Sequence, residues 1–261
     1  MNTDRMPVVF AGHGSPMNAI GDNRARQGWR AVGEHIVENY GKPSAILAVS
    51  AHWQARGSFH VHTDVVNPQI MDMWGFPEEL YQVHYQPDGD NELARRVLGL
   101  LGDRATADNE WGIDHGVWSV LAPMFPEADV PVVPMSVDMA ASADAHYRVG
   151  ADLRALRDEG VLVFASGNVV HNLMMVDWDS DAGADWADRF DKDIHDAIAA
   201  SDFGKVVHYE ELPDARLAVP TTDHFLPLLV ALGAVQVGDT IATFNDYREL
   251  GSMSMTSYIF G

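Results

Sequence analysis

Histidines follow three separate apolar runs of this sequence. They are His13 after Pro7–Ala11, His52 after Ala45–Ser50, and His171 a few residues after Val161–Ser166. Apolar runs of this length predict buried strands, and ligand sites of such sheets lie beyond the carboxyl ends of the strands. We therefore expect three imidazoles at one edge of a sheet, where small neighbours such as Gly12 and Gly14 let backbone and ligand approach closely.

Two further histidines are directly preceded by an aspartate. His115 lies in a glycine-flanked turn, WGIDHGVW, and His224 opens an apolar helical run, PTTDHFLPLL. Asp114 and Asp223 directly precede them, and each carboxylate either supports an imidazole or caps a helix. His60 and His62, which alternate along a predicted strand, are expected to be surface residues.

A metal site is the chemistry that these histidines favour. The chain has no cysteine, so the protein ligands are limited to imidazole and carboxylate. Three such ligands would leave open positions for a substrate, which is the pattern of catalytic sites. A single histidine at a strand end is more often a hydrogen-bonded core residue, but several such positions together favour metal binding.

The segments between the histidines predict the elements that position them. Further strands are expected at Val130–Val137 and Thr240–Asn245, and a weakly alternating edge strand is expected in Met253–Phe260. Helical periodicity is found in Arg24–Tyr40, Asn91–Leu101, Asp144–Glu159 and Asp185–Ala200. Alternating strands and helices predict an α/β fold, with a central mostly parallel or mixed sheet flanked by helices and the active site at the carboxyl ends of the strands.

Length, composition and charge limit the classes of function. The 261 residues contain no internal repeat and no flexible linker, so we expect a single domain, 1–261. No apolar window is long enough to span a membrane, and the N-terminal stretch has no signal-peptide pattern. A net charge of −21 argues against nucleic acid and anionic membranes as partners. The lack of cysteine favours a cytoplasmic location.

Six ordered motifs resemble those of a known family nearly from end to end. They are GHGSP, SAHW, WGIDHGVW, ASGNVVHNL, PTTDHFLPLL and GSMSM. Together they resemble the bacterial 4,5-DOPA extradiol dioxygenase family of class III extradiol dioxygenases, related to the catalytic subunit of protocatechuate 4,5-dioxygenase. The resemblance implies that His13, His52 and His224 bind a divalent metal. It also implies that His171 is the catalytic histidine, or a fourth ligand, and that His115 faces the substrate.

The resemblance also implies a reaction. A DOPA-like catechol would be cleaved with O₂ to a muconic semialdehyde, Fe²⁺ would serve as the catalytic metal, and Zn²⁺ would be able to occupy the same site. His171 would accept the catechol proton and later return it. The partners expected are therefore a small catechol and O₂, and a homo-oligomer is left open. The alternatives are a tetrapyrrole metal chelatase, a non-catalytic binding module of the same superfamily, and a zinc hydrolase.

Overall fold

The computed structural model describes residues 5–261, and within this range an eight-stranded sheet forms the centre of the molecule. The strand order is β4-β3-β5-β2-β6-β1-β10-β7. The strands are β1 Val8–Gly12, β2 Ala45–Ala55, β3 Phe59–Val61, β4 Ala105–Ala107, β5 Val132–Asp138, β6 Val161–Gly167, β7 Ile241–Phe244 and β10 Ser257–Phe260. Strands β5, β2, β6 and β1 are parallel neighbours, whereas β10 runs antiparallel to β1 and β7.

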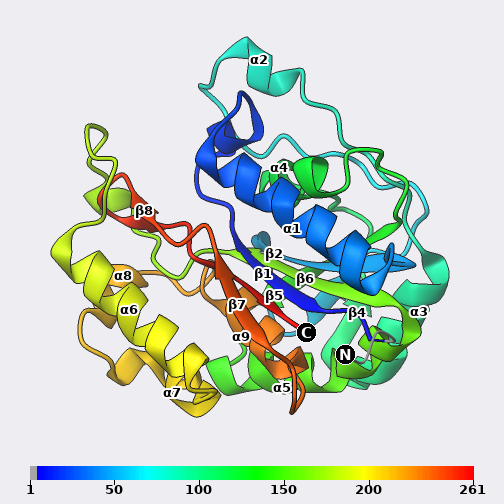
Figure 1. Cartoon of the computed structure of the whole chain (residues 1–261). Coiled ribbons are helices and arrows are strands. Elements are labelled where there is room, and N and C mark those ends of the chain that lie inside the picture. Colours follow the sequence, from blue (N-terminus) through cyan, green and yellow to red (C-terminus); the bar gives the residue numbers. More distant parts are fainter. Residues whose placement is uncertain (1–4) are drawn as a thin grey trace.

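Helices cover both faces of this sheet (Figure 1). One face carries α1 Arg24–Tyr40 and α4 His115–Met124, and the other carries α3 Asn91–Leu101, α5 Ala143–Leu153, α6 Asp185–Ala199 and α9 Leu226–Ala234. Short helices are α2 Glu78–Tyr81, α7 Phe203–Val207 and α8 Ala215–Ala218, with 3₁₀ turns at Pro16–Ala19, Gly102–Arg104, Arg154–Glu159, Leu173–Met175 and Tyr209–Glu211. The predicted α/β domain with a mixed sheet and flanking helices is confirmed.

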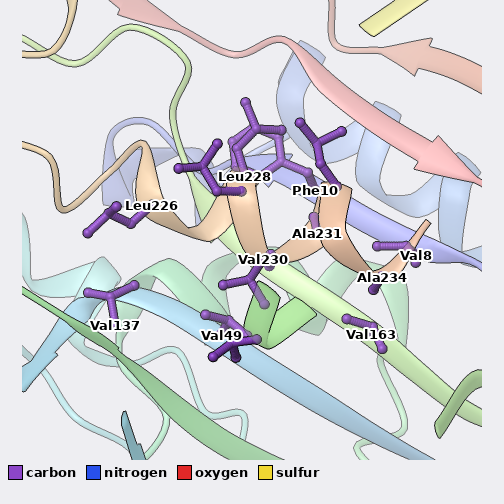
Figure 2. Close-up of a cluster of buried hydrophobic side chains, with 14 of the residues drawn as sticks. Val8, Phe10, Val49, Val137, Val163, Leu226, Leu228, Val230, Ala231 and Ala234 are labelled. Carbon is purple, nitrogen blue, oxygen red and sulfur yellow. The ribbon is translucent and has the colours of Figure 1, made fainter. Parts of the chain in front are cut away.

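The central strands are apolar on both faces because both faces are covered. Along β1, Val8 and Phe10 belong to the core between the sheet and α9. Val9 and Ala11 belong to the core on the opposite face, with residues of α1 and α4. Helix α9 is buried along its whole length, and Figure 2 shows its side chains against residues of β1, β2 and β6. Such two-sided burial produces continuous apolar strands rather than alternating ones.

The C-terminal strand is not at the edge of the sheet, so that prediction was wrong. Strand β10 lies between β1 and β7, and all four of its residues are buried. Burial on both faces explains why its alternation is weak in the sequence. The other part of Met253–Phe260 forms β9 Met253–Ser254, which pairs with β8 Arg248–Glu249 in a separate two-stranded sheet.

Two further local predictions differ from the structure. The helix expected over Asp144–Glu159 ends as α-helix at Leu153 and continues as a 3₁₀ segment. His62 is buried, not on the surface, and its ring hydrogen-bonds to the carbonyl oxygens of Trp111 and Val66. Loop packing that has no local sequence signal provides those acceptors. His60, its predicted partner on the surface, is half-buried beside Asp108.

None of the helices in the described part of the chain is long and apolar enough to cross a membrane. The prediction about the N-terminal stretch includes residues 1–4, which lie outside the described residues.

Candidate metal centre

Three adjacent strands carry histidines to one edge of the sheet. His13 directly follows β1, and His171 lies four residues beyond the end of β6, the strand between β1 and β2. His52 lies within β2, which continues past the predicted end at Ser50. Its pairing with β5 shifts register between Ser50 and Gln54, and an irregularity of this kind re-aims side chains, as β-bulges near active sites often do.

All five histidines singled out in the sequence come together. The ring centroids of His13 lie 4.7 Å from His52, 5.7 Å from His115 and 5.2 Å from His224. The His52 ring lies 4.1 Å from His115 and 5.1 Å from His224, and the rings of His171 and His224 stack at 3.6 Å. The sequence-based expectation of a shared edge is therefore met by the geometry.

The tautomer of His13 follows from its neighbour Ser166. The Ser166 hydroxyl donates to the carbonyl oxygen of Gly116 at 2.6 Å, so its only proton is used. The contact between His13 Nδ1 and Ser166 Oγ, at 2.9 Å, must then have Nδ1–H as the donor. Nε2 of His13 is left unprotonated, which is the form that binds a metal. Burial and the neighbouring histidines lower the pKa of His13, which also favours the neutral ring.

Two carboxylates hold His52 through its Nδ1 atom. Asp72 Oδ2 lies 3.2 Å and Asp114 Oδ1 3.3 Å from Nδ1. Burial opposes a charge on His52, but Asp114 and Asp72 outweigh it and raise the pKa of the ring to about 10. Nδ1 therefore carries the proton that faces the carboxylates, and Nε2 points away from them.

His224 has the same arrangement with its own carboxylate. Asp223 accepts a hydrogen bond from Nδ1 of His224 at 2.5 Å. Burial raises the pKa of Asp223, but the hydrogen bond and charge of His224 lower it more. The pKa of Asp223 therefore lies well below its ordinary value. Burial lowers the pKa of His224, against the effect of Asp223. Nε2 of His224 is again the atom presented to the site.

The Nε2 atoms of His52 and His224 fit a shared divalent ion. They lie 3.2 Å apart, and two nitrogens about 2.1 Å from one ion are about 3.0–3.4 Å apart at octahedral or tetrahedral angles. His13, His52 and His115 offer nitrogens that all lie within 4.8 Å of one another. The donor set thus suits a divalent metal, although the group of three histidines that meets this distance contains His115 where the resemblance implies His224.

His171 is oriented differently from the other imidazoles. Its ring plane makes an angle of 3° with that of His224. Ring nitrogens donate in the plane of the ring, so donors of two parallel rings point along parallel planes and do not converge on one point. Burial and the nearby His224 lower the pKa of His171 to about 2. Within residues 5–261 its ring makes no hydrogen bond.

Asp72 is a site residue that sequence analysis missed. Its Oδ2 lies 2.9 Å from Nδ1 of His115, and its Oδ1 accepts from the His115 backbone N–H at 2.9 Å. Burial opposes its charge, but His115 and His52 hold the pKa of the carboxyl well below its usual range. Asp72 lies in a loop without regular structure, so no periodicity or strand end marks it.

Asp114 fulfils both roles that the sequence left open. It caps α4 by accepting from the Gly116 N–H, and its other oxygen accepts from the Trp111 indole. Gly116, in the first turn of α4, packs closely against two imidazoles. A Cβ at this position would lie 3.1 Å from His52 Nδ1 and 3.2 Å from His13 Nδ1. Glycine at this position therefore lets α4 begin directly against the imidazole cluster.

Imidazoles that are held by carboxylates lie at the C-terminal ends of the strands of an α/β sheet. This combination of fold and site is typical of a metal-dependent enzyme. The family described as the catalytic LigB subunit of aromatic ring-opening dioxygenase matches residues 6–261, and the chain belongs to this family. The chain is 40% identical to the 4,5-DOPA dioxygenase extradiol of Escherichia coli K12, over all of this chain and 97% of that protein. It is 37% identical to the protein of the same name from Beta vulgaris, over 97% and 96% of the two chains.

A solved structure supports the fold independently. The crystal structure of an uncharacterised protein from Escherichia coli K12 superposes with a TM-score of 0.85 and 37% identity, covering 98% of this chain and all of that one. The predicted resemblance and enzyme class, an extradiol ring-cleaving dioxygenase that acts on a catechol with O₂, are confirmed. Nothing in these similarities favours a chelatase, a hydrolase or a binding module.

Proposed function

We propose that this chain, as one catalytic domain over 1–261, cleaves a DOPA-like catechol to a muconic semialdehyde with Fe²⁺ held by His13, His52 and His224. The observation that carries this assignment is the common anchoring of the three rings. Ser166, Asp114 with Asp72, and Asp223 each occupy an Nδ1 atom. Nε2 is then the nitrogen that each ligand presents to the metal, and on His52 it would lose its proton when the metal binds. The relatives named as 4,5-DOPA dioxygenases support the choice of substrate.

The bound metal would lower the pKa of a catechol hydroxyl and supply the redox chemistry for O₂. The protein's part is to fix the ligands before the substrate arrives, through buried hydrogen bonds that leave the rings little freedom. An all-nitrogen donor set does not reject zinc, which lies above Fe²⁺ in the usual order of affinities. We therefore propose Fe²⁺ as the catalytic ion and Zn²⁺ as a competitor for the same ligands.

His171 is proposed as the acid–base residue and not as a fourth ligand. Its ring is parallel to that of His224, so the in-plane nitrogens of the two rings do not aim at one ion. Because no hydrogen bond within residues 5–261 occupies its ring, both nitrogens are available to a substrate hydroxyl. Burial and the nearby His224 lower the pKa of His171, so the free ring is neutral and able to accept a proton from a catechol hydroxyl. His115, held by Asp72, is proposed to orient the catechol.

Reconstitution with Fe²⁺ under anaerobic conditions, followed by oxygen uptake with a panel of catechols, tests this function. His13→Ala is expected to lose the metal and the activity. His171→Ala is expected to keep iron while kcat falls about 10²–10⁴-fold, the scale for a lost general acid–base group. His84→Ala, which removes an exposed histidine outside the cluster, is the control. Loss of iron from His171→Ala as complete as from His13→Ala would make His171 a ligand and refute the acid–base assignment.

The remaining assignments concern the setting of the enzyme. We propose a cytoplasmic location, which the lack of cysteine favours, and fractionation of the source cells would test it. We leave a homo-oligomer as the assembly to be tested by light scattering on the metal-loaded protein.

A further inference from the structure

The carboxylate of Glu249 lies against the turn that follows His13. The side-chain amide of Asn18 donates to the carbonyl oxygen of His13 and to Glu249 Oε1, with both distances 3.4 Å. A Cβ placed on Gly14 would lie 2.9 Å from the same carboxylate oxygen. Glu249 therefore packs directly on the residue next to a proposed metal ligand, although its position in the sequence is 236 residues away from His13.

The two-stranded β8–β9 ribbon also places Glu249 on the same face as His171. Glu249 of β8 pairs with Met253 of β9, and Met253 pairs on its other side with His171. Directly paired residues point their side chains to the same face of a ribbon. With about 5 Å between paired Cα atoms, the Cα atoms of Glu249 and His171 are about 10 Å apart. The carboxylate thus lies on the His171 side of the ribbon, near the catalytic cluster.

Glu249 differs from the other carboxylates near the cluster because no cation compensates it. Each of the others contacts an imidazole, namely Asp72, Asp114 and Asp223. The neighbouring Arg248 is already engaged by three carboxylates, those of Asp188, Asp191 and Asp246, at 2.9 Å each. In the part of the chain that the structure describes, no arginine or lysine forms an ion pair with Glu249.

We propose that Glu249 binds a positively charged substituent of the aromatic substrate and selects catechols that carry an ammonium group. This inference rests on the proposed function, which anchors the two catechol hydroxyls at the imidazole cluster. The side chain of the substrate is then free to extend towards the His13 turn and the β8–β9 ribbon. A half-buried carboxylate without a cation attracts an ammonium group through a charge-assisted hydrogen bond and repels a carboxylate.

Two pairs of catechols isolate the ammonium group. DOPA differs from 3-(3,4-dihydroxyphenyl)propanoate only by the α-ammonium, and dopamine differs from 4-ethylcatechol in the same way. Binding to the zinc-loaded protein is measured by calorimetry, and kcat/KM is measured by oxygen uptake with the iron-loaded protein. We expect the wild type to favour the ammonium-bearing member of each pair by about three- to tenfold.

Glu249→Gln keeps the shape and an acceptor for Asn18, and it is expected to remove this preference without changing the affinity for 4-ethylcatechol. Glu34→Gln, which removes one charge from an exposed position of α1, is expected to keep the preference. The inference is overturned if the wild type shows no preference, or if Glu249→Gln weakens both members of a pair equally. Lack of turnover for every catechol would count against the proposed function instead, while the calorimetric comparison still decides the role of Glu249.

Discussion

Replacing Ser166 with alanine tests whether the tautomer of His13 is imposed by its hydrogen bonds. The hydroxyl of Ser166 accepts from His13 Nδ1 at 2.9 Å and donates to the Gly116 carbonyl at 2.6 Å. Both Ser166 and His13 are almost fully buried. Ser166→Ala removes only one oxygen atom, so any loss of stability or metal affinity reflects these two hydrogen bonds and not a change in packing volume.

The size of the effect follows from the two partners left behind. The Nδ1–H group of His13 and the carbonyl of Gly116 each lose their partner in a buried position, and each such loss costs about 1–3 kcal/mol. The free energy of unfolding of the metal-free protein should therefore fall by about 2–6 kcal/mol. Without the acceptor that holds Nδ1–H, His13 can adopt the other tautomer, so metal affinity should fall by about 10–100-fold.

Chemical denaturation measures the first quantity, and competition with a chromophoric chelator for Zn²⁺ measures the second. Ser119→Ala is a matched control, because Ser119 is also fully buried but its hydroxyl has no hydrogen-bond partner within residues 5–261. Removing that unpaired hydroxyl should be neutral or stabilising. Unchanged zinc affinity in Ser166→Ala, or an equal loss in Ser119→Ala, would refute the argument that Ser166 orients His13.

Two further predictions concern stability and the metal. Arg157→Met should lower the free energy of unfolding by about 3–5 kcal/mol in denaturant titrations, because it leaves the buried carboxylate of Asp239 without its partner at 2.6 Å. Arg96→Met, which removes an exposed ion pair, should leave stability nearly unchanged, and an equal loss in both variants would contradict this reasoning. Replacing Fe²⁺ by Zn²⁺ should abolish oxygen uptake because zinc has no accessible second oxidation state, so full activity in an iron-free zinc sample would contradict the proposed mechanism.

The sequence itself was sufficient for the fold class and for the location of the histidines. Apolar runs such as Ala45–Ser50 and Val161–Ser166 are long enough and bounded clearly enough to predict strands. Helices α1 and α3 have the expected periodicity, and in the structure Asn23 and Asp90 cap their N-termini. Once the strands are taken as parallel, His13, His52 and His171 must lie at the same edge. The signals for these elements are local, because burial and capping over a few residues determine where a strand or helix begins and ends.

Tertiary structure alone decided the details that give the site its chemistry. The register shift between Ser50 and Gln54 depends on pairing with β5. The hydrogen bond that His13 Nδ1–H donates to Ser166 joins residues 153 positions apart. Asp72 reaches His52 and His115 from an irregular loop, which no periodicity predicts. The interior position of β10 likewise depends on β7 pairing along its far side. Sequence patterns record whether a residue is buried and where an element ends, but the partner that a buried polar group meets is determined only when distant segments pack together.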